Sequence, residues 1–182
     1  MFHEYIDEEI EVLSSLYDTL ETLRLPCVYG SKFSSHARRM GAYTQENARQ
    51  ITLSLTQPAG WSKRFHCLLH GINQLLSIHL LRIQSPIKFD MAHVSKNVLC
   101  DPHVDACNEN VSILFAVGNY TGGQTILHDT TRTTNDSLGR QYYDISKGSL
   151  MFDAHKIVHE TSPFEGNRYC IVVYKAKQRG RH

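Results

Sequence analysis

The first part of the chain carries apolar residues at helical spacing. Between residues 4 and 24 they recur every three or four positions, at Ile6, Ile10, Leu13, Leu16, Tyr17, Leu20 and Leu23. This period predicts an amphipathic helix packed on a core, which ends before Pro26. A second apolar stripe predicts another helix from about Ser62 to Leu81. Residues 27–60 have weak periodicity and are expected to form loops with short strands.

From Pro86 onward the pattern changes to short β-branched and aromatic runs separated by turn residues. The runs are Ile87–Val94, Val111–Val117, Gln124–Leu127, Gln141–Ile145, Ser149–Phe152 and Tyr169–Tyr174. Closely spaced strands with no helical period between them indicate an antiparallel sandwich or barrel. We therefore expect an α+β protein of one domain. In it, residues 1–85 give helical support, residues 86–178 form an all-β core, and residues 179–182 form a basic tail.

Composition and charge narrow the class of protein. The chain has 182 residues, of which 41% are hydrophobic, as is usual for one folded domain. Its 19 basic and 18 acidic residues nearly cancel, whereas a protein that binds nucleic acid mainly through phosphates usually has a basic excess. The N-terminus shows no secretory signal and the five cysteines form no C-x-x-C pair, so we expect an intracellular protein with reduced thiols. Polar residues interrupt the longest apolar stretch, Cys67–Ile83, which argues against a membrane span.

The candidate chemistry begins at His103 and Asp105, which form a His-x-Asp motif. In an extended strand, residues two apart point to the same face, so both side chains can bind one ion. His159 supplies a third candidate ligand further along the chain. Two histidines and one carboxylate leave coordination positions open, which suits non-haem Fe(II) with a co-substrate and dioxygen. If that co-substrate is 2-oxoglutarate, Arg168 has the bidentate geometry needed to bind its far carboxylate.

The segment from about Lys88 to Lys175 resembles the double-stranded β-helix (jelly-roll, cupin-like) core of the Fe(II)/2-oxoglutarate dioxygenases. In that superfamily His-x-Asp is followed, after a long interval, by His and then by Arg or Lys on the last core strand. The segments 102–108, 118–123 and 159–169 are similar to the TET/JBP-like branch, whose members oxidise the methyl group of 5-methylcytosine or thymine in nucleic acid.

This resemblance implies an oxidoreductase that uses Fe(II), 2-oxoglutarate and dioxygen. It implies that His103, Asp105 and His159 are the metal ligands at the catalytic centre, and that Arg168 binds the co-substrate. It also implies that DNA or RNA is a candidate partner. Lys63, Arg64 and the basic tail are then candidate phosphate contacts. We expect a monomer.

Three further residues are candidates for the site. Asn108 follows the motif and is expected to orient the metal loop, to touch substrate or to form a turn. Ser112 is a candidate hydrogen-bond partner of 2-oxoglutarate, or else a serine inside the sheet. His155 competes with His159 as the distal ligand; the Pro-Phe-x-Gly-x-Arg register after His159 favours the latter, and leaves His155 in the preceding turn as a candidate substrate contact. Residues 120–123 are expected to form a tight turn.

Other functions remain open from the sequence. Cys100, His103, His155 and His159 could form a tetrahedral zinc site, but that arrangement leaves Asp105 and Arg168 without a role. The same enzyme class acting on a small metabolite or a protein side chain is an alternative, and compact size and balanced charge favour it. A β-barrel module that binds a metal without catalysis is another.

Overall fold

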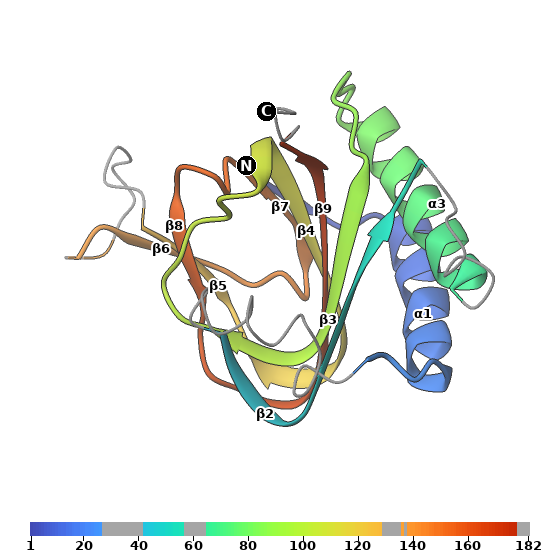
Figure 1. Ribbon diagram of the computed structural model, residues 1–182. Helices are drawn as coiled ribbons and strands as arrows, with labels where there is room; N and C mark the ends of the chain where they lie inside the picture. The colour runs from blue at the N-terminus through green and yellow to red at the C-terminus, as the bar shows by residue number, and fades with distance from the viewer. Residues whose placement is uncertain (27–41, 57–64, 129–135, 137, 178–182) are drawn as a thin grey trace, which may run out of the picture.

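Two antiparallel sheets form the body of the protein (Figure 1). The computed structural model describes residues 1–26, 42–56, 65–128, 136 and 138–177. The larger sheet has six strands in the order β1-β7-β4-β9-β3-β2, and the smaller has three in the order β6-β5-β8. The strands are β1 (Phe2–Glu4), β2 (Ala42–Ser54), β3 (Met91–Cys100), β4 (Asn108–Gly122), β5 (Thr125–His128), β6 (Arg140–Tyr143), β7 (Gly148–Phe152), β8 (Val158–Thr161) and β9 (Phe164–Ala176). The prediction of an antiparallel sandwich is confirmed.

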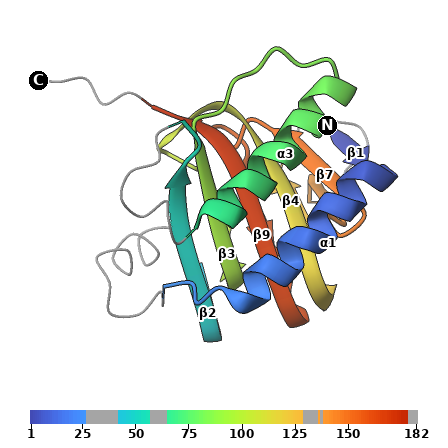
Figure 2. The same cartoon turned by 90° about the vertical axis from the view of Figure 1, so that its right-hand side faces the viewer.

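Two helices, α1 (Asp7–Thr22) and α3 (His66–Arg82), lie side by side on the outer face of the larger sheet (Figure 2). Acidic residues occupy the first turn of α1, where the helix dipole favours negative charge. A Cβ added at Gly71 of α3 would lie 2.6 Å from Leu16 Cδ2 of α1, so the helices approach closely there. Leu16 is 1% exposed, and burying such a side chain contributes roughly 1.5–3 kcal/mol. Among the described residues, no helix has the length and apolar character needed to cross a membrane.

Side chains of β4 and β9 alternate between two cores because successive residues of a strand point to opposite faces. One core lies under the helices and includes Ile113, Phe115, Ile171 and Val173. The other lies between the two sheets and includes Leu114, Ala116, Leu150, Phe152 and Cys170. By the same alternation Ser112 and Arg168 belong to the inner face, between the sheets. The sheet therefore presents its polar candidates toward the interior of the sandwich.

Several element boundaries differ from the expected ones. β1 (Phe2–Glu4), which pairs with β7, was not predicted. The stretch expected to hold only short strands contains β2, which has 13 residues. The His-x-Asp motif lies outside any strand, because β3 ends at Cys100 and Pro102 has no N–H group to continue the ladder. The strand pleat therefore does not align the two ligands, contrary to the expectation, and backbone contacts of the loop position them instead.

Candidate metal centre

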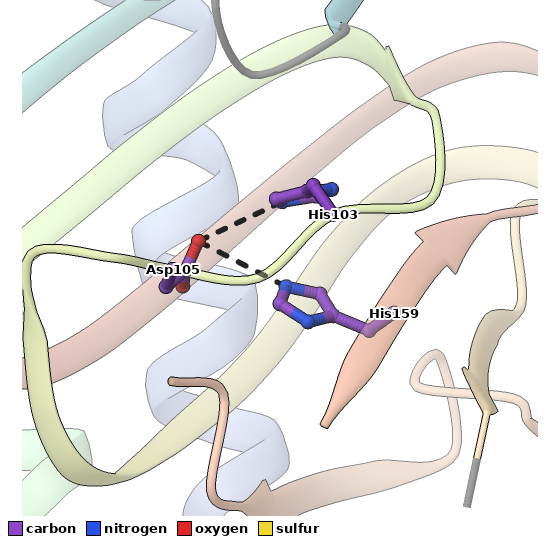
Figure 3. Close-up of side chains that lie close together, drawn as sticks. All are labelled: His103, Asp105 and His159. Atoms are coloured by element: carbon purple, nitrogen blue, oxygen red, sulfur yellow. Dashed lines mark ion pairs between the residues drawn. The ribbon is translucent and has the colours of Figure 1, made fainter. Parts of the chain in front are cut away.

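The side chains of His103, Asp105 and His159 point toward one another (Figure 3). One potential ligand atom from each lies within 4.8 Å of the others. His103 and Asp105 come from the loop between β3 and β4, and His159 comes from β8. The His103 N–H donates to the His159 carbonyl at 3.0 Å, and the His159 N–H donates to the His103 carbonyl at 2.9 Å. This pair of hydrogen bonds fixes the loop against β8.

The backbone around Asp105 is held as well. Its N–H donates to the Ala154 carbonyl at 2.8 Å, and its carbonyl accepts the Asn108 N–H at 3.0 Å. The first bond joins the loop to the turn after β7, and the second closes a tight turn at the start of β4. Backbone hydrogen bonds therefore set the position of all three candidate ligands.

Both histidines have a fixed ring orientation. His103 Nδ1 lies 2.6 Å from the Asp101 carbonyl and His159 Nδ1 lies 3.0 Å from the Ile157 carbonyl. A carbonyl only accepts, so each Nδ1 carries the proton and each Nε2 keeps its lone pair. The two Nε2 atoms face the Asp105 Oδ1 atom at 3.6 and 3.9 Å. The rings thus present the nitrogen that binds a metal toward the carboxylate.

The electrostatics favour the form of His159 that binds metal. Burial lowers its pKa, and the neighbouring His103 adds to this effect while the Asp105 carboxylate opposes it. A neutral imidazole is the form that coordinates a cation. The side chains of His103, Asp105 and His159 are 12%, 16% and 9% exposed, so the group is partly accessible. Two histidines and one carboxylate fit a non-haem iron(II) site.

The tetrahedral zinc set of the alternative prediction is not assembled. Among the described residues, the group able to hold a metal comprises His103, Asp105 and His159, without Cys100 or His155. Burial raises the pKa of Cys100 to about 12, which keeps the thiol protonated. His155 lies in the turn before β8, as expected, and its Nδ1 atom lies 3.4 Å from the Asp105 carbonyl. The assignment of His159, and not His155, as the distal ligand stays a prediction, and the grouping of His159 with His103 and Asp105 supports it.

Arg168 lies on the inner face of β9 and is only 3% exposed. Its backbone N–H donates to Asn97 Oδ1 at 2.8 Å, and its guanidinium carbon lies 5.7 Å from the centre of the Tyr120 ring. Both Arg168 Nε and the Tyr120 hydroxyl are buried without a hydrogen-bond partner in the structure. Buried donors without partners are costly, and a charged one costs most. An anionic group such as a carboxylate would satisfy both.

Gly123 makes room for the Arg168 side chain. A Cβ at this position would lie 2.9 Å from both Cδ and Nε of Arg168. Gly122 and Gly123 have φ of 78° and 68°, values that favour glycine. The predicted tight turn over residues 120–123 is wrong for residues 120–122, which pair with β9 as the end of β4. Gly123 instead allows the close approach of the arginine, whose chamber it shapes.

The arginine and the metal ligands border one interior region. The pKa of Cys100 responds to charge on both Arg168 and Asp105, although burial is the larger cause of its shift. Ser112 lies elsewhere on the inner face: Gly118 pairs with Arg168, and Ser112 lies six positions earlier on β4, about 20 Å along the strand. Ser112 therefore lies near Asp105, through Asn108, and not near the guanidinium.

Sequence reasoning missed two tyrosines at this site. Tyr120 was assigned only to a turn, although it stacks beside Arg168. Tyr174 shares the inner face of β9, and burial together with the nearby Asp105 carboxylate raises its pKa to about 12. Counting alternate positions forward from Arg168 would have found Tyr174, since residues 168, 170, 172 and 174 share a face. The proposed phosphate contacts Lys63, Arg64 and residues 179–182 lie outside the described residues.

Comparison with solved structures identifies the architecture. A Pseudomonas putida prolyl-4-hydroxylase superposes with a TM-score of 0.53 at 12% identity, over 98% of this chain and 92% of that one. The chain has the fold of a 2OG-Fe(II) oxygenase. An oxidoreductase of the 2OG-Fe(II) oxygenase family from Burkholderia pseudomallei gives a TM-score of 0.51 at 12% identity, over 92% of this chain and 94% of that one.

The oxygenase fold confirms the predicted double-stranded β-helix with supporting helices. The two likenesses concern the fold, since at 12% identity little of the sequence is shared. No family model matches the sequence, and no curated protein matches it. The TET/JBP-like resemblance therefore rests on the motifs in the sequence.

Proposed function

We propose that the protein is an Fe(II)- and 2-oxoglutarate-dependent dioxygenase that hydroxylates a C–H bond. The observation that carries this proposal is the convergence of His103, Asp105 and His159 within 4.8 Å, with each side chain partly exposed. The buried Arg168 Nε atom, which has no hydrogen-bond partner in the structure, supports 2-oxoglutarate as the co-substrate, because a carboxylate would satisfy it. A structural zinc site would not need this arginine.

Each residue has one task in this proposal. Fe(II), 2-oxoglutarate and dioxygen together supply the oxidation of a substrate C–H bond to C–OH, with succinate and carbon dioxide as co-products. His103, Asp105 and His159 hold the metal, while Arg168 and the Tyr120 hydroxyl bind the far carboxylate of the co-substrate. Ser112 remains a candidate contact of the co-substrate near the metal. The apolar residues between the sheets keep water away from the reacting atoms.

Succinate formation tests the activity directly. It should require both Fe(II) and 2-oxoglutarate, and His103→Ala should reduce it at least a hundredfold because a metal ligand is lost. His66→Ala is the matched control, since His66 is exposed on α3 and lies outside the candidate metal group. Tight zinc retention with no turnover would support the non-catalytic metal-binding module instead.

We propose that the substrate is a side chain of a protein or peptide. A small metabolite is the less favoured substrate. The balanced charge of the chain supports a substrate that is not held through phosphates. One protein with this fold is a prolyl-4-hydroxylase, so peptidyl proline is the first candidate to assay. Tyr174 and His155 are the proposed substrate contacts, because the Asp105 carboxylate is near enough to raise the pKa of Tyr174 and the Asp105 carbonyl lies 3.4 Å from His155 Nδ1.

A methylated pyrimidine in nucleic acid is the second candidate. The segments 102–108, 118–123 and 159–169 favour it, since they are similar to the TET/JBP-like branch. Mass spectrometry separates the two candidates: proline peptides and a methylated oligonucleotide are incubated with the enzyme, Fe(II) and 2-oxoglutarate. A mass gain of one oxygen on the peptide supports the first candidate, and loss of the methylpyrimidine supports the second. If neither changes while succinate forms, the small-metabolite substrate is favoured.

A further inference from the structure

One oxygen of the Asp105 carboxylate is bound by a neighbouring amide. Asn108 Nδ2 donates to Asp105 Oδ2 at 2.8 Å and to Ser112 Oγ at 3.1 Å. A side-chain amide has two N–H hydrogens, so both are used in these two bonds. Asn108 is 5% exposed and Ser112 is fully buried. The contacts therefore form a closed, buried chain from the sheet to the metal ligand.

The other oxygen of the carboxylate points to the metal position. Asp105 Oδ1 faces the Nε2 atoms of His103 and His159 at 3.6 and 3.9 Å (Figure 3). With Oδ2 bound to Asn108, the carboxylate offers one oxygen to a metal. A facial group with three ligand atoms leaves three positions of an octahedral metal open. A carboxylate that bound through both oxygens would occupy one of them.

Ser112 anchors this arrangement to the sheet. It lies on β4 opposite Phe152 of β7, in the middle of the larger sheet, where neighbouring strands fix the backbone. Asn108 lies where the metal loop joins β4, and its own N–H donates to the Asp105 carbonyl at 3.0 Å. The asparagine thus bonds to Asp105 through both backbone and side chain, while Ser112 fixes the rotation of its amide.

We propose that Asn108 is a positioning residue that holds Asp105 as a one-oxygen metal ligand, and that Ser112 acts through Asn108. This inference rests on the proposed metal site and assigns Asn108 a role different from substrate contact. Both amide hydrogens of Asn108 point into the protein, so no N–H remains to donate to a substrate. Residues that orient metal ligands typically change metal affinity or activity by about 10–100-fold when they are removed.

Binding of Co(II) alone to the full chain tests the inference without a substrate. Asn108→Ala should weaken Co(II) binding about 10–100-fold and change the Co(II) absorption spectrum, because Asp105 is free to rotate. Ser112→Ala should weaken binding less, and the double variant should resemble Asn108→Ala, since residues that act in series are not additive. Asn73→Ala is the matched control: its Nδ2 donates to the Leu69 carbonyl at 3.0 Å on an exposed helix face.

Each result has a definite meaning. Wild-type affinity and an unchanged spectrum in a folded Asn108→Ala variant overturn the inference and leave the metal site intact. Full additivity of the two substitutions overturns the part assigned to Ser112. If the wild-type protein does not bind Co(II), the proposed metal site itself is wrong. Should Asn108→Ala fail to fold, Asn108→Leu fills a similar volume without a donor, and the same weakening is expected from it.

Discussion

The most informative single residue is Arg168, a cation that is only 3% exposed. Its guanidinium packs between the rings of Tyr120 and Phe164, at 5.7 and 5.6 Å, and its Nε atom has no partner. Structural arginines at such depth are normally paired with a carboxylate. The environment therefore fits a residue whose partner is a bound anion.

Substitution of Arg168 should weaken the binding of 2-oxoglutarate and leave the affinity for the metal unchanged. A hydrogen bond to a charged group is worth about 1.5–3 kcal/mol, so Arg168→Ala should raise the KM for 2-oxoglutarate at least about tenfold. Arg168→Lys keeps the charge but loses the planar fork, so it should recover only part of this effect. Succinate assays give the KM, and Co(II) titration should give wild-type affinity. An unchanged KM in both variants would disprove the co-substrate role.

Substitution of Gly123 tests the same chamber without changing the arginine itself. Gly123→Ala forces a Cβ to within 2.9 Å of Arg168 Cδ and Nε at a φ of 68°. We expect a loss of about 1–3 kcal/mol in the free energy of unfolding, together with weaker 2-oxoglutarate binding. Gly139→Ala is the control, since φ at Gly139 is 73° in the turn before β6. The control should lose stability but keep its affinity for 2-oxoglutarate, as measured by urea unfolding and by KM.

The role of a residue could be predicted from the sequence where it follows from the type of the residue and its spacing from the other candidates. His103, Asp105 and Arg168 belong to a pattern that the linear sequence displays. Tyr120 does not, because its importance depends on the β4–β9 register that places it beside the arginine. The contacts of Asn108 are local, to Asp105 and Ser112 three and four residues away, but three roles were compatible with its position in the sequence. Contacts across strands are set by register, which one sequence does not specify.

At the scale of elements, a buried polar cluster joins the helices to the sheet. His79 Nδ1 of α3 donates to Glu9 Oε1 of α1 at 2.7 Å, and its Nε2 accepts the Ser149 hydroxyl of β7 at 3.2 Å. Arg82 donates to both Glu9 oxygens at 3.1 Å. Glu9 and His79 are both fully buried, so helix packing depends on this cluster as well as on leucine side chains.

The cluster makes stability depend on pH. Burial lowers the pKa of His79, although Glu9 opposes the shift. Near pH 6, His79 is therefore protonated in more of the unfolded chains than of the folded ones. The free energy of unfolding should therefore fall as pH decreases through about 6.5, by up to about 1.4 kcal/mol per pH unit. Urea unfolding at several pH values measures this slope. His79→Gln should be less stable at neutral pH yet show a shallower slope; an equal slope would assign the effect to other histidines.

Element prediction succeeded where periodicity was long and failed where it was short. The helices were found because each repeats its apolar stripe over several turns. β8 was missed because it has four residues, three of them polar. β1 was not predicted because three residues carry too little pattern to indicate a strand. Short strands gain their stability from partners, so their own sequence says little about them.

At the scale of the whole molecule, metal binding should stabilise the fold. A ligand bound only by the folded state adds about 2.7 kcal/mol at a free concentration of 100 times its Kd. For a domain of this size that corresponds to a rise in Tm of about 5–11 °C. Thermal unfolding with and without Co(II) measures the rise, and it should be absent in His159→Ala. A rise that persists in this variant would mean that the cation binds elsewhere.

The overall architecture was predictable for a different reason from the site. The strand spacing and turn residues after Pro86 predicted an antiparallel sandwich. The order of the His-x-Asp, His and Arg motifs indicated that this sandwich is a double-stranded β-helix. The contribution of the first 85 residues was underestimated: besides the helices they supply β1 and β2, the two edge strands of the larger sheet. Edge strands far from their partners in sequence leave no local signal of the pairing.

The backbone pair between His103 and His159 also has a kinetic consequence. Because the two imidazoles stand on directly paired residues, they can move apart only when the loop separates from β8 or when a ring rotates away from its carbonyl partner. We therefore expect local opening of the loop to speed the release of a bound ion. Slow hydrogen exchange at these two amides would accompany slow metal release, and any substitution that loosens the loop would shorten both together.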